Sequence, residues 1–269
     1  SPQVFGGQVL GQALSAAQHT VEGRVAHSLH GYFLRRGDIN APIIYDVDRS
    51  RDGGSFSNRR VVAIQHGRPI LNLAASFQVP QDGLSHQAEM PEVPEPDGLK
   101  DLTHLAADVL DTIPVKLRRF MTDQRPFEFR PVEQSDLDDP ARRPPYKRVW
   151  IRAVDAMPDE VALHQNLLAY VSDFELLTTA TLPHALPFTR GRVILASLDH
   201  ALWFHREFRM DEWLLYSMDS PNASGARGFA RGQFFTQSGE LVASTTQEGL
   251  IRVVDPSRAK QRSDPRAQV

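Results

Sequence analysis

Three positions in the second half of the chain combine polar side chains with apolar surroundings, and they are where chemistry is expected. Asp173 follows an apolar helical pattern, Ser197 lies in an alternating strand-like run, and Gln247 lies in a polar cluster within a final strand-like run. Ser197 and Asp199 are expected on one face of the same strand. A carboxylate beside an apolar face must be paired or hydrogen-bonded. Ordinary interpretations remain open: an exposed helix residue for Asp173, and an edge-strand residue for Gln247.

Several standard catalytic devices are missing from the sequence. It has no cysteine, which excludes disulfides and thiolate nucleophiles. It has no G-x-S-x-G motif, no G-x-x-x-x-G-K-[ST] motif and no G-x-G-x-x-G opening a βαβ unit. The glycine-rich stretch Gly6-Gly7, with Gly11 one turn later, opens a helical pattern. It favours either backbone contact with an anion, because helix N-termini present free N–H groups, or close packing of the helix on the sheet.

Histidine spacing gives little support for a metal site. His27 and His30 are three apart and His200 and His205 are five apart, so each pair points to opposite faces of a strand. No cluster of carboxylates or cysteines completes a ligand set. The sequence therefore predicts no metal and no other cofactor.

Charge and hydropathy exclude some classes of partner. The net charge of −3 and a pI near 6.4 give no sign of a nucleic-acid or membrane-surface protein. No apolar run of about 18 residues and no signal peptide are present, so we expect a cytoplasmic protein. The chain starts abruptly at Ser1 without a methionine, which suggests a missing N-terminal piece.

The order of expected elements repeats along the chain. In the first half, a helix over residues 8–18 precedes strands over 27–35, 42–48 and 58–79, the last divided by a turn at His66-Gly67. In the second half, strands precede a helix over 163–177, and a strand-rich stretch follows over 192–254, with a turn at Ser238-Gly239. We divide the chain into a first repeat (1–80), a linker with a helix over 102–120 (81–125), a second repeat (126–255) and a charged tail (256–269).

An offset of 171 positions brings out identities between the halves. They are Phe33 with Phe204, Arg35 with Arg206, Tyr45 with Tyr216, Asp48 with Asp219, Gly54 with Gly225, and Arg60 with Arg231. Together with the matching element order, they favour internal duplication. One long helix followed by an antiparallel meander is the hotdog unit, so we predict an α+β tandem double hotdog. The first copy lacks the strand that precedes the helix in the second copy.

The sequence resembles the acyl-CoA thioesterase II family from residue 4 to about 253. In the first half the resemblance rests on Val4-Phe5-Gly6-Gly7-Gln8-Val9, His30-Gly31-Tyr32-Phe33-Leu34-Arg35 and Ala75-Ser76-Phe77-Gln78. In the second half it rests on Leu198-Asp199-His200, Trp203-Phe204-His205, Ala226-Arg227-Gly228 and Gln247-Glu248-Gly249. The resemblance implies hydrolysis of acyl-CoA to a free fatty acid and CoA, without a covalent acyl-enzyme.

By motif position, the family's water-holding Asp, Thr or Ser, and Gln fall on Asp173, Ser197 and Gln247. Many relatives have Thr at the position of Ser197, so the hydroxyl is kept but rotamer restriction is looser. Asp173 is the expected proton acceptor, and the other two orient the water. Oxyanion donors are expected at a helix start near His164–Asn166. The helix over 8–18 has no Asp matching Asp173, so we predict one site per chain and a mainly structural first repeat.

Candidates for binding the CoA phosphates are six basic residues: Arg59, Arg60, Lys147, Arg148, Arg227 and Arg231. A hotdog hydratase or dehydratase with a catalytic His164 or His200 is one alternative, and a non-catalytic acyl-CoA-binding protein is another. We expect a homo-oligomer. The acyl-chain preference and the pathway do not follow from the sequence.

Overall fold

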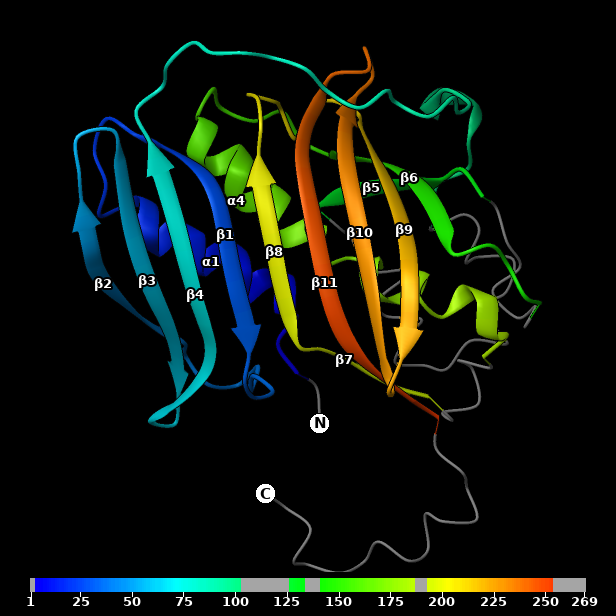
Figure 1. The fold of residues 1–269 in the computed structure, drawn as a ribbon, viewed down its shortest axis with the longest axis horizontal. Coiled ribbons are helices and arrows are strands. Elements are labelled where there is room, and N and C mark those ends of the chain that lie inside the picture. The colour runs from blue at the N-terminus through cyan, green and yellow to red at the C-terminus, as the bar shows by residue number, and fades with distance from the viewer. Residues whose placement is uncertain (1–2, 103–125, 134–140, 187–192, 254–269) are drawn as a thin grey trace, which may run out of the picture.

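A computed structural model describes residues 3–102, 126–133, 141–186 and 193–253. It contains a single antiparallel sheet of eleven strands, with helices α1 (Gly6–Gln18) and α4 (Val161–Ser172) side by side on one face (Figure 1). The first-half strands are β1 (Val25–Phe33), β2 (Ile44–Asp52), β3 (Phe56–Gln65) and β4 (Arg68–Gln78). The second half contributes β5 (Phe127–Pro131), β6 (Tyr146–Ala153), β7 (Val193–Ser197), β8 (Asp199–Phe204), β9 (Leu214–Ser224), β10 (Arg227–Thr236) and β11 (Leu241–Val253).

The two halves join at the middle of the sheet. The strand order is β2-β3-β4-β1-β8-β11-β10-β9-β6-β5, and β7 also pairs with β11. The central pair β1 and β8 is antiparallel, with Leu29 opposite Leu202. The predicted α+β double hotdog is therefore confirmed, and the two repeats share one continuous sheet.

Strand pairing shows the duplication directly. In the first half Asp48 pairs with Arg60, and a register shift follows before Arg51 pairs with Asn58. In the second half Asp219 pairs with Arg231, and the same shift precedes the pairing of Asn222 with Phe229. Each residue of the second set stands 171 positions after its counterpart, so even the bulge is repeated. Because bulges depend on local sequence and twist, a shared one supports common descent of the halves.

The helices approach closely because glycines line their contact. A Cβ on Gly7 would lie 2.0 Å from the carbonyl oxygen of Tyr170, and one on Gly11 would lie 2.7 Å from that of Asn166. The glycine-rich stretch thus packs α1 against α4 rather than against the sheet. Antiparallel packing brings the start of α1 to the end of α4, and this juxtaposition creates the candidate site.

The helix expected over 163–177 is interrupted. Asp173 is the C-cap of α4, and Glu175 has a positive φ of 61° before the short helix α5 (Leu176–Thr179) begins. A left-handed residue cannot continue a right-handed helix, so the chain turns there. As a result Asp173 lies at a helix end rather than within a helix.

The proline-rich linker is ordered where it is described. Met90, Val93 and Leu99 pack against a second apolar cluster formed by Trp150, Trp213, Leu215, Phe235 and Leu241. The indole Nε1 of Trp150 donates to the carbonyl of Pro94 at 2.9 Å. The linker therefore crosses from the first half to the second along the edge of the sheet where β4 ends (Figure 1).

Some predictions lie outside the described residues. They are the helix over 102–120 beyond Leu102 and the charged tail. Across the described part of the chain, no helix has both the length and the apolarity to cross a bilayer.

Candidate functional site

Asp173, Ser197 and Gln247 meet in one cluster, although they come from three separate elements. The Asp173 Oδ1 accepts a 2.5 Å hydrogen bond from the Gln247 Nε2 and a 3.4 Å bond from the Ser197 hydroxyl. Asp173 caps α4, Ser197 ends β7 and Gln247 faces inward from β11. The structure thus brings together the three residues singled out in the sequence.

Asp199 does not share this role. It opens β8, after the chain has bent at Leu198, and its Oδ1 accepts a hydrogen bond from the backbone N–H of Glu248 at 2.6 Å. The expectation that Ser197 and Asp199 share one strand face is wrong, because the register against β11 shifts by one residue between β7 and β8.

The protein surroundings of Asp173 stabilise its neutral form relative to an aspartate in water. Enclosure of the carboxyl group by protein raises its pKa from 3.8 to about 6, while hydrogen bonds from Gln247, the Gly7 backbone and Ser197 act in the opposite direction. Part of the residue remains accessible to solvent. A carboxyl group with a pKa near 6 is ionised at neutral pH and is a stronger base than an ordinary aspartate.

The start of α1 completes the cluster from the first repeat. The backbone N–H of Gly7 hydrogen-bonds to the Asp173 carboxylate, and a Cβ on Gly6 would lie 2.6 Å from its Oδ2. The first repeat is therefore more than a scaffold. The N-terminal end of a helix carries partial positive charge, which suits an anionic group or a developing oxyanion.

The start of α4, near His164, was expected to supply oxyanion donors, but the cluster lies at the opposite end of that helix. Nine residues separate His164 from Asp173, or about 14 Å at 1.5 Å per helical residue. His164 is buried, and both its ring nitrogens are engaged, with the Pro158 carbonyl and the Met210 backbone N–H. That expectation was wrong because sequence alone did not show which helix end faces the cluster.

His200 adjoins the cluster, which sequence reasoning did not foresee. It is 1% exposed, and its Nδ1 lies 3.1 Å from the Gln247 Nε2. Its Nε2 lies 2.8 Å from the Ser172 hydroxyl and 3.0 Å from the Thr245 hydroxyl. Strand alternation offered a signal, since His200 shares its inward face with Leu202 and Phe204.

Within the described residues, neither histidine of the hydratase alternative is hydrogen-bonded or ion-paired to a carboxylate. His200 reaches Asp173 only through the Gln247 amide, and His164 bonds to backbone groups. Among the described residues, no group of three or more His, Cys, Asp and Glu side chains is arranged to hold a metal ion.

Arg59 does not fit the expected role in binding phosphate. It is 2% exposed, and its donors reach the hydroxyl and carbonyl of Thr20, the carbonyls of Arg51 and Asn58, and the Asp52 carboxylate. These five bonds use all five guanidinium N–H groups. Arg59 therefore anchors the loop after α1 to the sheet and has no donor left for a ligand.

The other five basic candidates lie nearer the surface. Lys147 binds Glu175 and Thr178, and Arg148 binds Glu133. Arg227 pairs with Glu248 and Arg231 with Asp219, while Arg60 is exposed. Exposed ion pairs contribute little stability and can rearrange around a ligand.

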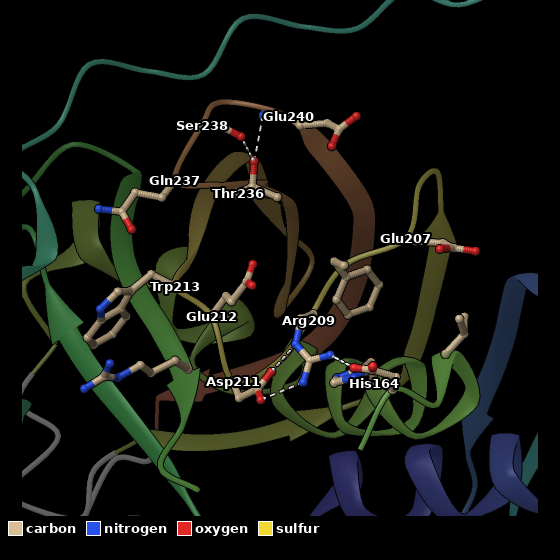
Figure 2. Close-up of a pocket in the computed structure, with 14 residues that line it drawn as sticks. His164, Glu207, Arg209, Asp211, Glu212, Trp213, Thr236, Gln237, Ser238 and Glu240 are labelled. Atoms are coloured by element: carbon tan, nitrogen blue, oxygen red, sulfur yellow. Dashed lines mark hydrogen bonds and ion pairs between the residues drawn. The ribbon is translucent and has the colours of Figure 1, made fainter. Parts of the chain in front are cut away.

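One cavity lies away from the cluster, at the start of α4 (Figure 2). It measures about 860 Å³, and His164, Arg209 and Trp213 help to line it. Arg209 is held by Asp211 and Asp159, so its charge is already neutralised. A smaller cavity of about 570 Å³ lies at the start of α1, beside Phe5 and Gln8. The smaller cavity is therefore at the helix end that touches Asp173.

The first repeat carries no second copy of the cluster. Strand pairing shows which positions are equivalent. Ala26 pairs with Phe77 in the first repeat as Ser197 pairs with Gly249 in the second, so Ala26 is equivalent to Ser197. The same registers make Ala75 equivalent to Gln247. When the two helices are aligned about their contact at Gly11 and Asn166, Gln18 is the position in α1 equivalent to Asp173. These counterparts, Gln18, Ala26 and Ala75, offer no carboxylate or hydroxyl. The asymmetry supports one catalytic cluster per chain.

Comparison with known proteins identifies the family. Residues 1–78 match the model described as acyl-CoA thioesterase N-terminal domain, and residues 117–250 match the one described as acyl-CoA thioesterase. The chain is 43% identical to acyl-CoA thioesterase 2 of Haemophilus influenzae, covering 93% of this chain and 88% of that protein. The chain belongs to the acyl-CoA thioesterase family.

Two further relatives agree with this assignment. Human acyl-coenzyme A thioesterase 8 is 42% identical over 93% of this chain and 81% of its own length. The crystal structure of an acyl-CoA thioesterase II from Mycobacterium marinum is 44% identical, with a TM-score of 0.76 over 92% of this chain and 89% of that one. Both halves of the present chain are therefore accounted for within this family.

Proposed function

We propose that this chain hydrolyses acyl-CoA thioesters through a water molecule held by Asp173, Ser197 and Gln247. Membership of the thioesterase family supports the reaction. The Ser197 hydroxyl and the Gln247 amide both donate to the Asp173 Oδ1, and this convergence carries the assignment of the site. A carboxylate, a hydroxyl and an amide together can accept a proton from water and orient its lone pair.

The proposed chemistry is direct attack by water. The water oxygen forms a bond to the thioester carbonyl carbon as Asp173 accepts one of its protons. The carbonyl π electrons move to oxygen, and the start of α1, which adjoins Asp173 at Gly6, supplies positive potential for that oxyanion. Collapse of the intermediate breaks the C–S bond and releases the CoA thiolate, which takes the proton that Asp173 accepted and so restores the carboxylate. The products are a fatty acid and CoA.

Gln247 contributes through its second amide atom. Its Nε2 is occupied by Asp173 and His200, while its Oε1 is buried and has no hydrogen-bond partner within the described residues. A buried acceptor without a partner costs about 1–3 kcal/mol, and a substrate water donating to it would recover that cost. Asp173 and Gln247 Oε1 would then hold the same water.

The test is release of free thiol from a panel of acyl-CoA substrates of different length and branching. Wild type should turn over part of the panel, while Asp173→Ala should lose at least about 100-fold in kcat, the usual range for a lost general base. Asp97→Asn, at an exposed carboxylate paired with Arg130, serves as the matched control and should keep its activity. Near-normal turnover by Asp173→Ala would remove the aspartate from the mechanism.

The same panel separates the alternatives. A non-catalytic acyl-CoA-binding protein would bind the substrates and release no thiol. A hydratase would add water to 2-enoyl-CoA and leave the thioester intact. Phosphate binding by Arg60, Lys147, Arg148, Arg227 or Arg231 would appear as a raised KM on replacement by alanine.

Assembly and location remain part of this proposal. We infer a cytoplasmic homo-oligomer, supported by exposed apolar residues on the sheet such as Tyr32 (63% exposed) and Ile44 (65% exposed). Apolar side chains left exposed on a sheet can be covered by a second copy of the chain. Light scattering after size-exclusion chromatography measures the assembly, and cell fractionation measures the location.

A further inference from the structure

His200 is placed to control the orientation of the Gln247 side chain. Its ring fills the space between the catalytic cluster and two buried hydroxyl groups, and it is 1% exposed. Its hydrogen-bond partners among the described residues are Ser172, Thr245 and Gln247, and Asp173 is not among them. Any effect on the reaction must therefore pass through Gln247.

Counting protons around His200 fixes its tautomer. The Ser172 hydroxyl donates its one proton to the Ala169 carbonyl at 3.0 Å, and the Thr245 hydroxyl donates to the Ala201 carbonyl at 2.8 Å. With their protons directed to these carbonyls, both hydroxyls accept from the His200 Nε2, so this hydrogen-bond arrangement places the ring proton on Nε2. The ring is neutral, so Nδ1 is left as an acceptor. Burial agrees with this, since it lowers the His200 pKa to about 3.

The tautomer in turn fixes the amide of Gln247. Two acceptors, the His200 Nδ1 and the Asp173 Oδ1, lie 3.1 and 2.5 Å from one amide atom. Only the NH₂ group can donate to both, so Nε2 must occupy that position. The rotated amide would place its oxygen against a carboxylate oxygen and a ring lone pair. Oε1 is consequently directed away from both, as the free acceptor of the site.

We propose that His200, itself held by Ser172 and Thr245, is a positioning residue that locks the Gln247 amide with its N–H groups toward Asp173. The proposal rests on the proposed function, because it assigns a purpose to an amide that holds the hydrolytic water. Without the hydrogen bond to His200, the Gln247 amide can rotate. Its Oε1 then no longer faces the water, and its Nε2 no longer donates to Asp173 in every conformation.

The first repeat supplies a suitable replacement. Leu29 occupies the position in β1 that corresponds to His200 in β8, so leucine is accommodated by this fold on an inward face. In His200→Leu, Ser172 and Thr245 keep the hydrogen bonds that they donate to backbone carbonyls. Loss of activity in this variant would therefore not require unfolding.

Two further variants separate orientation from packing. His200→Asn keeps an acceptor near the position of Nδ1, where Gln247 donates. His200→Gln extends its amide to the position of Nε2, toward Ser172 and Thr245, and leaves Gln247 without its acceptor. His205→Asn is the matched control, because His205 directly follows the same strand and bonds to Ser244.

The experiment measures kcat, KM and the pH profile of thiol release for the four variants, with Asp173→Asn in parallel. We expect kcat to fall at least about 10-fold in His200→Leu and His200→Gln, to recover within about 3-fold of wild type in His200→Asn, and to be unchanged in His205→Asn. KM should change little. The acid limb of the His200→Leu profile should move to higher pH, because the Gln247 hydrogen bond lowers the Asp173 pKa.

Other results would overturn the proposal. A folded His200→Leu with wild-type kcat removes the positioning role, and equal losses in the Leu, Gln and Asn variants show that packing alone matters. If Asp173→Asn is inactive while His200→Leu is normal, only the inference about His200 fails. If Asp173→Asn is active, the proposed function itself fails. Loss of the acid limb in every His200 variant would make His200 the base.

Discussion

Replacing Asp173 with asparagine should stabilise the protein at neutral pH relative to acid pH, while it removes activity. The carboxyl group has a pKa of about 6 in the folded chain, against 3.8 for the ordinary group. The folded state therefore binds a proton that the unfolded state releases between about pH 4 and pH 6. The group contributes stability that is present below pH 4 and is lost as pH rises through 6.

The magnitude follows from the pKa difference of about two units. At 1.36 kcal/mol per unit, ionising Asp173 costs the folded state roughly 3 kcal/mol between pH 4 and pH 7. Solvent that reaches the carboxylate reduces this figure. Asparagine has nearly the same shape and does not ionise. The free energy of unfolding of the variant minus that of wild type should therefore rise by up to that amount across the window.

The assay is urea unfolding of both proteins at intervals from pH 4 to pH 8. The buried Trp150 provides the fluorescence signal. All other titrating groups are common to the two proteins and largely cancel in the difference. A difference that stays flat from pH 4 to pH 8 would show that the Asp173 pKa is not raised, and would remove the argument for a strengthened base.

Two other predictions concern residues around the cluster. Gly6→Ala should lower kcat at least about 10-fold with little loss of stability, because its Cβ would first meet the side chains of Asp173 and Phe33. Gly7→Ala should lower the free energy of unfolding by about 2–3 kcal/mol, because its Cβ would meet the Tyr170 backbone at 2.0 Å. Thiol-release kinetics and urea unfolding distinguish them, and the reverse pattern would contradict the assigned geometry. Arg59→Ala should lower stability by roughly 3 kcal/mol by leaving buried carbonyls unpaired, with KM for acyl-CoA unchanged; a raised KM at unchanged stability would restore Arg59 as a ligand contact.

Local sequence patterns predicted much of the fold. Alternating apolar residues located the strands, and the turns at His66-Gly67 and Ser238-Gly239 have the positive φ angles that glycine favours. The offset of 171 positions indicated the duplication, which the repeated bulge confirms. The strands and turns depend on residues close together in the chain, and the duplication emerges from aligning the two halves, so none of these features needs tertiary information.

The arrangement of the site was less accessible to sequence reasoning. That the start of α1 meets the end of α4 depends on long-range packing, so the sequence alone did not show that the start of α4 lies away from Asp173. Nothing in the sequence marks the left-handed conformation of Glu175, which ends α4 at Asp173. For Arg59 a signal did exist, because it shares its strand face with Val61 and Ala63. A buried arginine runs against general preference, and this led to its interpretation as a surface residue.

The most direct test of direct water attack is a single turnover in H₂¹⁸O with enzyme in excess over acyl-CoA. We predict that the fatty acid released carries one ¹⁸O atom and that the mass of the quenched protein stays unchanged at every time point. An acyl adduct on the chain at early times, or ¹⁸O incorporated into Asp173, would show that the carboxylate is a nucleophile. That result would contradict the role of Asp173 as the base for a water held by Ser197 and Gln247.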